Sequence, residues 1–381
     1  MSKIHYKILT DAAELHPDWE VLGERSIFFQ KRYLQFLHSN TPQNMECFFV
    51  EIYQNNLLSG IALIQTIQLK KLDFLGNTSS NTKHYIKSFL TKKFIHTSLV
   101  VGNNMLSGQK AFYFHKNLPL ELGVKYITLA SKEIAKRSYL KGKKVKLQIF
   151  KDFHADDLQN IKDKLSDDCY CFSTQPNMVF YIKNNWTHFD DYINDLSKKY
   201  RDQYKRCRKK SIEVDKRKLT FDDLESLQSR MYELYLNVVN QSDFNTFFLP
   251  ENHFSAMKRH LQDDFLIYGY FDNKKLIGFN TLIKNGSIME TYFLGYDLTL
   301  QKDKMLYLNM LYDMVAYSIN NGFEQVNFGR TALEIKSSIG AEAVPLFGFM
   351  QHQSAIIQSL MPHFFNFYEP KVVWQKRNPF K

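Results

Sequence analysis

A short polar segment in the second half of the chain brings together side chains that bind anions. Arg330 can hold a phosphate or carboxylate through two parallel hydrogen bonds, and Glu334 follows one helical turn later. Lys336 can neutralise a phosphate as a point charge, and Gly329 permits a close backbone approach. We expect Glu334 to act in catalysis and Arg330 and Lys336 to bind the anionic part of a cofactor. The alternatives are an ion pair that fixes the loop and a solvated lysine.

Four further polar residues precede this segment. Glu290 and Tyr292 alternate in a run of strand-forming residues, so their side chains share one face. If that face lines a cleft, Glu290 is a candidate general base and Tyr292 a substrate contact; if it faces water, Glu290 is ordinary. Asp297 could orient a substrate amine, or it supplies turn chemistry. Asn245 lies in the aromatic segment 243–250, which lines an acceptor pocket or covers the edge of a core.

A strongly basic stretch is predicted to form one long helix from residue 186 to residue 210, with Thr187 as its N-cap. A narrow apolar stripe can pack, and over residues 196–210 the remaining surface carries eight basic residues against one acid, Asp202. Repulsion between like charges at helical spacing costs stability, so the density of charge needs a reason. Arg201, Lys205 and Arg208 are therefore candidate contacts to tRNA or another anionic substrate; the alternatives are an anionic membrane surface and a solvated face.

The elements that must position these residues occur twice along the chain. A hairpin with an Asn turn is predicted at 47–64 and again at 265–283. Each hairpin is followed by a strand that ends near a glycine, by a helix at about 120–140 or 304–321, and by a further strand. The same order in both halves indicates one supersecondary plan used twice.

This order predicts the fold class. A strand, a crossover helix and a second strand lie parallel in one sheet, and such units form a crevice at the carboxyl ends of the strands. The preceding hairpins make each sheet mixed. We therefore expect an α/β protein of two modules, residues 1–184 and residues 185–381, with the active cleft in the second.

Composition sets the limits of the interpretation. With 50 Lys and Arg against 39 Asp and Glu, the net charge of +11 favours anionic partners, although it also serves solubility. The first residues lack the apolar run of a signal peptide, no stretch is apolar enough to span a bilayer, and we expect a cytoplasmic protein. The four cysteines and twelve histidines show no metal-binding spacing, so we expect no metal.

Three segments resemble a bacterial family of tandem GNAT-like proteins related to the Fem-type aminoacyltransferases of peptidoglycan biosynthesis. They are the basic stretch 196–210, the run from Leu294-Gly295-Tyr296-Asp297 to the helix ending at Gly322, and residues 327–341. The resemblance covers residues 185–350 well and the first module in outline. It implies a tandem GNAT fold, direct passage of an acyl group to an amine, and acyl-CoA or aminoacyl-tRNA as donor. It also places Tyr307 where such enzymes contact the donor; packing within a helix is the alternative.

The turn that would hold the pyrophosphate of coenzyme A departs from this family pattern. Such a site uses a glycine-rich turn before a helix, whose backbone N–H groups hold the phosphates. Residues 297–304 contain no glycine, which leaves Lys302 and Lys304 to bind phosphate as point charges.

We therefore expect an acyl- or aminoacyltransferase that acts on an amine of a cell-envelope precursor. The second module carries the site and the first is a degenerate copy that supports it. The alternative is a non-catalytic GNAT-like protein that recognises an anionic partner such as RNA or an envelope precursor through the basic stretch.

Overall fold

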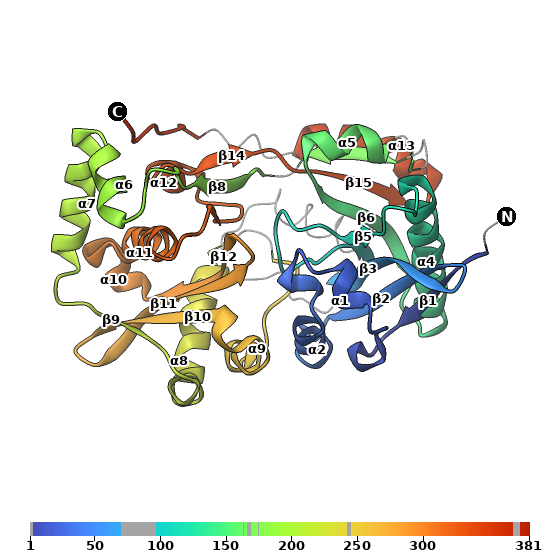
Figure 1. The fold of residues 1–381 in the computed structure, drawn as a ribbon, viewed down its shortest axis with the longest axis horizontal. Helices are drawn as coiled ribbons and strands as arrows, with labels where there is room; N and C mark the ends of the chain where they lie inside the picture. The colour runs from blue at the N-terminus through green and yellow to red at the C-terminus, as the bar shows by residue number, and fades with distance from the viewer. Residues whose placement is uncertain are drawn as a thin grey trace, which may run out of the picture. The chain divides into compact units, whose positions relative to one another are not determined.

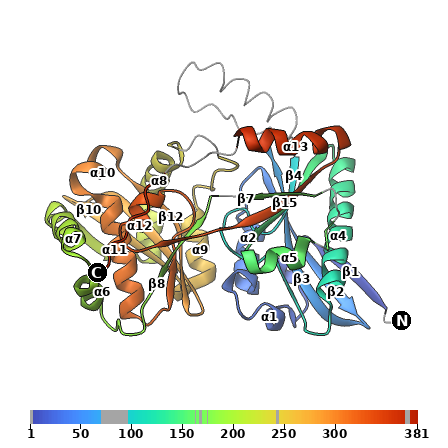
Figure 2. The same cartoon turned by 90° about the horizontal axis from the view of Figure 1, so that it is seen from above.

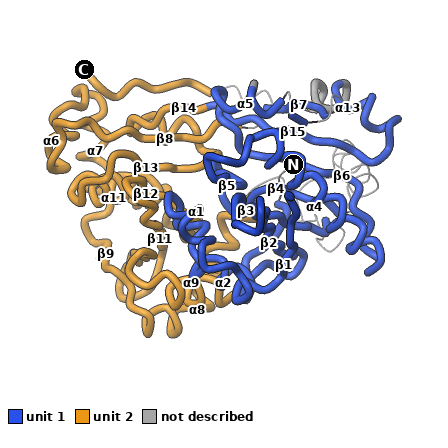
Figure 3. The backbone as a smooth tube through the Cα atoms, turned by 45° about the vertical axis from the view of Figure 1, so that its right-hand side comes forward, with its two compact units in different colours: residues 1–174, 244–250, 345–371 blue, residues 175–243, 251–344, 372–381 orange. Residues whose placement is uncertain are grey.

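The computed structural model describes residues 3–69, 97–162, 164–165, 169–173, 175–241, 245–368 and 374–381. The chain folds into two compact units (Figure 3). Unit 1 contains residues 1–174, 244–250 and 345–371; unit 2 contains residues 175–243, 251–344 and 372–381. None of the helices formed by the described residues has the length and apolar content needed to cross a bilayer.

Unit 1 is built on an eight-stranded mixed sheet with the order β1-β2-β3-β4-β6-β15-β7, and β5 pairs with β3 (Figure 1). Its strands are β1 (Ile4–Leu9), β2 (Met45–Gln54), β3 (Leu57–Gln68), β4 (Thr97–Val101), β5 (Phe112–Phe114), β6 (Val145–Phe153), β7 (Tyr170–Ser173) and β15 (Phe347–His352). Strands β4 and β6 are parallel, and the other described pairs are antiparallel.

Alternation along β2 divides the apolar side chains of unit 1 between the two faces of the sheet. Phe48 and Val50 join the core under α4, whereas Phe49 meets Trp19 of α1 at 6.2 Å between ring centroids. Contacts place α4 across β1, β2, β3, β4 and β6 (Figure 2). The helices of unit 1 are α1 (Trp19–Leu22), α2 (Lys31–Ser39), α4 (Leu120–Leu140), α5 (Ala155–Lys162) and α13 (Ala355–Tyr368).

Unit 2 is built on a seven-stranded mixed sheet with the order β14-β8-β13-β12-β11-β10-β9 (Figure 1). Its strands are β8 (Asn177–Tyr181), β9 (Asp215–Lys218), β10 (Phe265–Asp272), β11 (Lys275–Asn285), β12 (Ile288–Tyr296), β13 (Gln325–Asn327) and β14 (Glu342–Val344). Here β12 and β13 form the parallel pair.

The helices of unit 2 cover both faces of its sheet. The main core lies between one face and α11, while Tyr235 of α8 and Phe254 of α9 contact Phe293 and Phe279 on the other face. The helices are α6 (Phe189–Asp195), α7 (Lys198–Lys210), α8 (Phe221–Val239), α9 (His253–Leu261), α10 (Leu298–Lys304), α11 (Leu306–Asn320) and α12 (Leu333–Ser337).

Both units follow the repeated plan that the sequence predicts. Hairpin β2–β3 turns at Asn55 and Asn56, and hairpin β10–β11 turns at Asn273 and Lys274; all four residues have positive φ, as a two-residue type I′ turn requires. Each hairpin leads to a strand, a helix and a parallel strand, β4-α4-β6 in unit 1 and β12-α11-β13 in unit 2. The α/β class with mixed sheets is confirmed.

The long basic helix predicted between residues 186 and 210 is broken into α6 and α7. Leu196 has an extended backbone, is fully buried, and forms an isolated bridge with Phe380. Thr187 is not the N-cap of α6 either: His188 takes that place, and Thr187 donates to the Asp191 side chain. The predicted helix at 304–321 begins after Met305, whose left-handed backbone separates α10 from α11.

The compact units group the chain differently from the continuous stretches 1–184 and 185–381. Strand β8 pairs with β13 and β14 and belongs to unit 2, although it precedes residue 184. Strand β15 pairs with β6 and β7 and belongs to unit 1, although it lies near the end of the chain. Sheet pairing between distant segments decides this grouping, and local sequence carries little information about it.

Candidate active site

The two parallel strands of unit 2 separate shortly after they pair. Their register joins Ile288 to Gln325 and ends where Glu290 meets Asn327. Strand β12 continues to Tyr296, whereas the chain after β13 turns to β8, because the Phe328 amide donates to the Met178 carbonyl at 2.8 Å. In open α/β sheets ligands bind where such strands diverge, so the chemical groups near Glu290 are the first candidates.

A β-bulge lies in β12 just beyond this point. Tyr292 and Phe293 together face Thr281 of β11, where the register shifts. The Thr281 hydroxyl donates to the Phe293 carbonyl at 2.5 Å. A bulge re-aims side chains and is common beside active sites. Here it leaves Tyr292 and Phe293 in contact with the helices α9 and α8, respectively.

Glu290, Tyr292 and His253 form a polar cluster on that face. The Glu290 carboxylate is buried and accepts a hydrogen bond of 3.1 Å from the Asn285 amide. The Tyr292 hydroxyl lies 3.1 Å from His253 Nε2, and their rings stack at 5.8 Å. Burial lowers the pKa of His253 to about 3, so its imidazole is neutral near pH 7. This face of β12 therefore carries a buried, hydrogen-bonded carboxylate and, two residues further along the strand, an uncharged hydrogen-bonding pair.

Lys336 holds the loop that follows β13 from inside. Its Nζ donates to the carbonyls of Phe328 and Arg330 at 2.7 Å each and of Gly329 at 3.3 Å. Burial lowers the pKa of Lys336 to about 7, and the three carbonyls oppose this shift because they stabilise the ammonium form. The structure thus brings Lys336 and Arg330 together through the backbone, with the Lys336 amine inside the loop.

The same loop has a strained backbone. Thr331 and Ala332 have φ values of 67° and 49°, in the left-handed region that a β-branched residue rarely adopts. Such conformations cost roughly 1–3 kcal/mol each and persist where the surroundings impose them. The three bonds from Lys336, together with the backbone bonds of Phe328 and Gly329 to Met178, constrain the loop 328–332, which is thus a preorganised element beside the separating strands.

Glu334 pairs with the tail of the chain. Its carboxylate accepts a hydrogen bond of 3.0 Å from Arg377 Nε, and the Arg377 amide donates to the Ser337 hydroxyl at 3.0 Å. A cavity of about 410 Å³ opens beside it. The cavity is lined by Gln175, Thr331, Ala332, Leu333, Glu334, Ile335 and Trp374. Glu334 therefore stands at a pocket, with Arg377 as its charge partner.

Asp297 has a structural position at the start of α10. It caps the helix by accepting from the Thr299 amide at 3.0 Å, and it pairs with Arg230 at 3.0 Å. Burial raises the pKa of Asp297, but the bonds from Thr299 and Arg230 outweigh burial and lower it below the usual value. Asp297 is thus an ionised, hydrogen-bonded carboxylate.

The lysines of α10 and Tyr307 lie in three different settings. Lys304 pairs with Asp272 at 3.1 Å and Glu213 at 3.3 Å. Lys302 is exposed. Tyr307 packs its ring 6.1 Å from that of Tyr296, and burial raises its pKa. Of these predicted donor contacts, Lys302 is the one exposed to solvent.

The residues after β12 do not fit a pyrophosphate held by backbone amides. The short helix α10 fills the place of a glycine-rich turn, and Leu306 and Leu308 in the first turn of α11 are buried. Helix α7 packs on the junction of α10 and α11, because the Ser211 hydroxyl donates to the Lys304 carbonyl and the Cys207 thiol to the Met305 carbonyl. A helix N-terminus binds an anion through free N–H groups, and at the start of α10 the Thr299 N–H is already bound by the Asp297 carboxylate.

Helix α7 divides its basic residues between protein contacts and solvent. Arg208 pairs with Asp313 at 2.8 Å and donates to Asn309 at 3.0 Å, while Arg201 donates to the Leu196 carbonyl. Lys205 is exposed. The exposed basic residues of the helix, called here the α7 basic face, are Lys198, Lys199, Lys205, Arg206, Lys209 and Lys210.

The predicted residues therefore form separate groups. Glu290 and Tyr292 lie together on β12, and Arg330, Glu334 and Lys336 lie on the loop and helix after β13. Asn245 belongs to unit 1, and residues 243 and 244 of its segment lie outside the described residues. His253, Arg377 and Asp313 were missed, because each meets its partner across a long stretch of sequence and no spacing signals it. Among the described residues, no group of His, Cys, Asp or Glu could hold a metal ion.

Comparisons with known proteins agree with this architecture. Residues 198–337 match the family described as Acetyltransferase (GNAT) domain. FemX shares the fold with a TM-score of 0.52 at 12% identity, over 87% of this chain and 93% of its own. A tandem GNAT protein from the clavulanic acid biosynthesis pathway has a TM-score of 0.53 at 8% identity, over 92% and 99%. No curated protein matches the sequence.

The family match spans α7 to α12, the part of the chain that holds the separating strands and their polar residues. The whole-chain similarities, at 12% and 8% identity, establish the tandem fold. The chain thus has a fold of two tandem GNAT-like modules, which FemX shares, and residues 198–337 within it match the GNAT acetyltransferase domain.

Proposed function

We propose that the chain transfers an aminoacyl group from aminoacyl-tRNA to an amine of a cell-envelope precursor. The observation that carries the proposal is the match of residues 198–337 to the GNAT acetyltransferase domain, over a sheet whose parallel strands separate after Glu290 and Asn327. GNAT domains pass an acyl group directly to an amine, and unit 2 holds a buried carboxylate beside the separating strands.

The choice of donor rests on charge and on the misfit to coenzyme A. The turn after β12 contains no glycine, and Asp297 already accepts from the Thr299 amide at the start of α10, which argues against a CoA thioester held in the usual way. The α7 basic face presents six exposed cations, and the chain carries a net charge of +11. A tRNA backbone supplies many phosphates that such a face can bind. Aminoacyl-tRNA therefore suits this chain better than acyl-CoA.

The reaction needs a base and a placed amine. The neutral amine attacks the ester carbonyl, the C–N bond forms, and the C–O bond to the terminal ribose breaks; a base takes the proton from the amine and returns it to the leaving ribose oxygen. Glu290 fits the role of base, because its buried carboxylate is held by Asn285 next to Tyr292. Water exclusion around a buried carboxylate strengthens its interaction with an ammonium group.

The test combines donor binding with transfer. Purified full-length chain is titrated with aminoacylated tRNA, deacylated tRNA, acetyl-CoA and a long-chain acyl-CoA, and transfer of a labelled amino acid to lysine-containing peptides is then followed. We expect binding of charged tRNA and label in the peptide. Glu290→Gln should keep tRNA affinity and lower the transfer rate by about 10²–10⁴-fold, the range for loss of a general base.

The matched control is Glu342→Gln, which changes an exposed carboxylate on β14. It should leave the transfer rate unchanged. Turnover of acetyl-CoA without binding of charged tRNA would rule out the proposed donor. If none of the four ligands binds, a non-catalytic protein for another anionic partner becomes the better account.

A further inference from the structure

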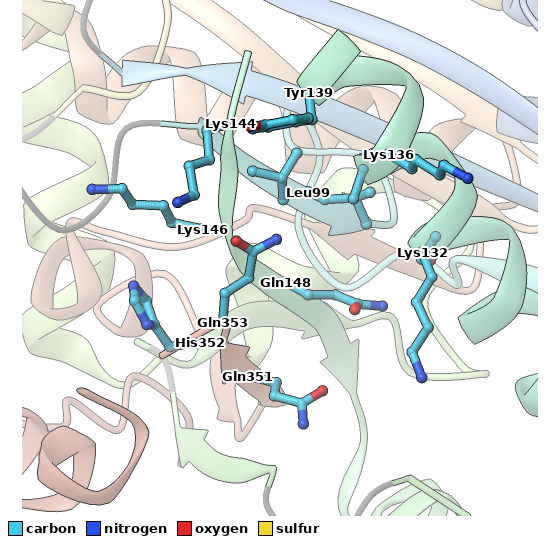
Figure 4. A pocket seen from close by; sticks show the side chains of 13 residues that line it. Leu99, Lys132, Lys136, Tyr139, Lys144, Lys146, Gln148, Gln351, His352 and Gln353 are labelled. Carbon is cyan, nitrogen blue, oxygen red and sulfur yellow. The ribbon is translucent and has the colours of Figure 1, made fainter. Parts of the chain in front are cut away.

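Unit 1 contains a cavity of about 640 Å³ that has no part in the site proposed above. It lies between the second half of α4, the start of β6, the middle of β4 and the end of β15 (Figure 4). Its lining residues are Leu99, Ser131, Lys132, Ala135, Lys136, Tyr139, Lys144, Val145, Lys146, Gln148, Gln351, His352 and Gln353. A volume of this size holds a small-molecule ligand, since such sites measure about 300–1,000 Å³.

The charged side chains that line this cavity are all basic. Four lysines line the cavity and no acidic residue does. Lys132 and Lys136 stand one turn apart on α4, and Lys144 and Lys146 are two residues apart at the start of β6. Figure 4 shows these pairs on opposite sides of the cavity. An anion that binds between the two pairs is attracted by all four cations.

The cavity is also lined by three amide side chains, those of Gln148, Gln351 and Gln353. Gln148 of β6 lies in register with Leu99 of β4 and with Gln351 of β15. The backbone N–H of Gln353 donates to the Lys146 carbonyl at 2.9 Å. Paired residues in neighbouring strands share a face, so Gln148 and Gln351 lie on the same side of the sheet, and Gln353 lines the same cavity (Figure 4). Three amides can read the hydroxyl or carbonyl groups of a polar ligand.

Gln148 carries an unmet donor. Its Nε2 atom is buried and has no hydrogen-bond partner among the described residues. A buried N–H without an acceptor costs about 1–3 kcal/mol. An acceptor oxygen of a bound ligand would remove that cost, which makes Gln148 an independent sign of a ligand site.

The cavity is distinct from the place where the strands of this unit would form a GNAT-type crevice. That place is at the carboxyl ends of β4 and β6, where Lys151 donates to the carbonyls of Asn103 and Leu106 at 2.8 Å each. The cavity instead lies toward the amino end of β6, beside the carboxyl end of α4. The helix dipole there disfavours an anion by roughly half a charge, which four lysines exceed.

We infer that this cavity binds a small molecule that carries phosphate groups on a polar body about the size of a nucleotide. The lysines hold the phosphates as point charges, and Gln148, Gln351 and Gln353 hydrogen-bond the polar body. The volume exceeds the need of a single phosphate group, which sets the size of the ligand. The inference is independent of the transferase activity of unit 2.

The experiment is calorimetric titration of the full-length chain with inorganic phosphate, pyrophosphate, ADP and adenosine. We expect ADP to bind most tightly, pyrophosphate and phosphate more weakly, and adenosine at least tenfold more weakly than ADP. Lys132→Ala combined with Lys144→Ala should weaken ADP binding by at least tenfold. Gln148→Met should weaken ADP more than pyrophosphate, because it removes a contact to the polar body.

The matched control is Lys125→Ala, an exposed lysine on α4 that does not line the cavity. It should leave the ADP affinity unchanged. Lys132 and Lys144 are exposed, so their loss should leave the melting temperature within about 2 °C. The inference is overturned if no phosphate-bearing probe binds at millimolar concentration. It is equally overturned if binding survives the lysine and Gln148 variants but is lost when the α7 basic face is reversed in sign.

Discussion

At the scale of single residues, Lys336 decides the shape of the loop beside the separating strands. Its three hydrogen bonds fix the carbonyls of residues 328–330 ahead of the strained pair Thr331 and Ala332. Removing the amine leaves these carbonyls without their internal donor and the strain without its constraint. The loop also bonds to Met178 of β8 and to the Asn327 side chain, so a change of Lys336 tests the share of this one side chain.

Lys336→Met should lower the free energy of unfolding by about 2 kcal/mol or more above pH 7, because the hydrogen bonds of the amine to three carbonyls of the loop are lost. The effect should depend on pH. Burial lowers the pKa of Lys336 to about 7, against roughly 10.4 in the unfolded chain, so between these values the unfolded chain binds the extra proton. The stability of the native chain relative to Lys336→Met should therefore rise from pH 7 to pH 9.

Urea unfolding of both proteins at several pH values measures this difference. Met is close to Lys in shape, so packing is largely kept. A difference that stays constant from pH 7 to pH 9 would mean that the carbonyls keep the ammonium form and that burial does not lower its pKa as stated.

Sequence spacing identified the residues of this loop but not their partners. Arg330, Glu334 and Lys336 lie within seven positions, so the sequence alone indicates that they are neighbours. Glu334 meets Arg377, 43 positions away, and Tyr292 meets His253, 39 positions away. A pattern of residue types carries no signal for a partner brought in by tertiary folding, so the expected pair of Arg330 and Glu334 stays a prediction.

At the scale of elements, α7 has one face that packs and one that is exposed. Arg208 reaches Asp313 on α11, which also accepts a hydrogen bond of 2.9 Å from the Tyr270 hydroxyl. The α7 basic face makes no comparable contacts at Lys205 or Lys209, which are exposed. The two kinds of basic residue should therefore respond to substitution in opposite ways.

Lys205→Glu combined with Lys209→Glu should weaken binding of charged tRNA by at least tenfold and reduce its dependence on salt, because phosphate contacts are lost. The free energy of unfolding should change by less than about 0.5 kcal/mol, since both residues are exposed. Filter binding at several salt concentrations and urea unfolding measure the two effects. Lys125→Glu in unit 1 is the matched charge reversal and should leave tRNA affinity unchanged.

Arg208→Ala should show the reverse pattern, with a loss of stability of more than about 1 kcal/mol, because Asp313 loses a charge partner inside the fold. Weakened tRNA binding in Lys125→Glu as strong as in the α7 variant would show that overall charge, and not this helix, governs binding.

Elements with local determinants were predicted well. The hairpins β2–β3 and β10–β11 depend on two-residue turns that the sequence marks with asparagine, and α4 occupies the predicted residues 120–140. The break at Leu196 was missed because its cause, the bridge to Phe380, lies 184 positions away. The residue types around Leu196 predict a continuous helix, and the break depends on the bridge to Phe380 in the tail of the chain.

At the scale of the whole molecule, each unit depends on segments from distant parts of the chain. The tail at 374–381 belongs to unit 2, where Phe380 packs beside Gly340 and Trp186. Residues 345–371 belong to unit 1. A boundary drawn once along the sequence therefore removes pieces from both units.

A fragment of residues 1–184 should be much less stable than unit 1 in the full chain, because it lacks β15. This strand pairs on both sides, with β6 and with β7, so its loss leaves β7 without a ladder partner and turns β6 into an edge strand. It also removes the buried side chains of Leu346, Phe349 and Met350. Each of these contributes about 1.5–3 kcal/mol by burial, a sum comparable to the total stability of a domain.

Adding residues 345–371 to the fragment through a flexible linker should restore cooperative unfolding, which circular dichroism in urea can follow. The control is the same linker with residues 345–371 in scrambled order, which keeps composition but destroys the alternation that places Phe349 in the core. Restoration by the native and not the scrambled segment would show that the register of β15 completes the sheet. The prediction is wrong if the fragment 1–184 alone unfolds cooperatively at the same urea concentration as the linked form. That result would mean that the first module folds stably without β15.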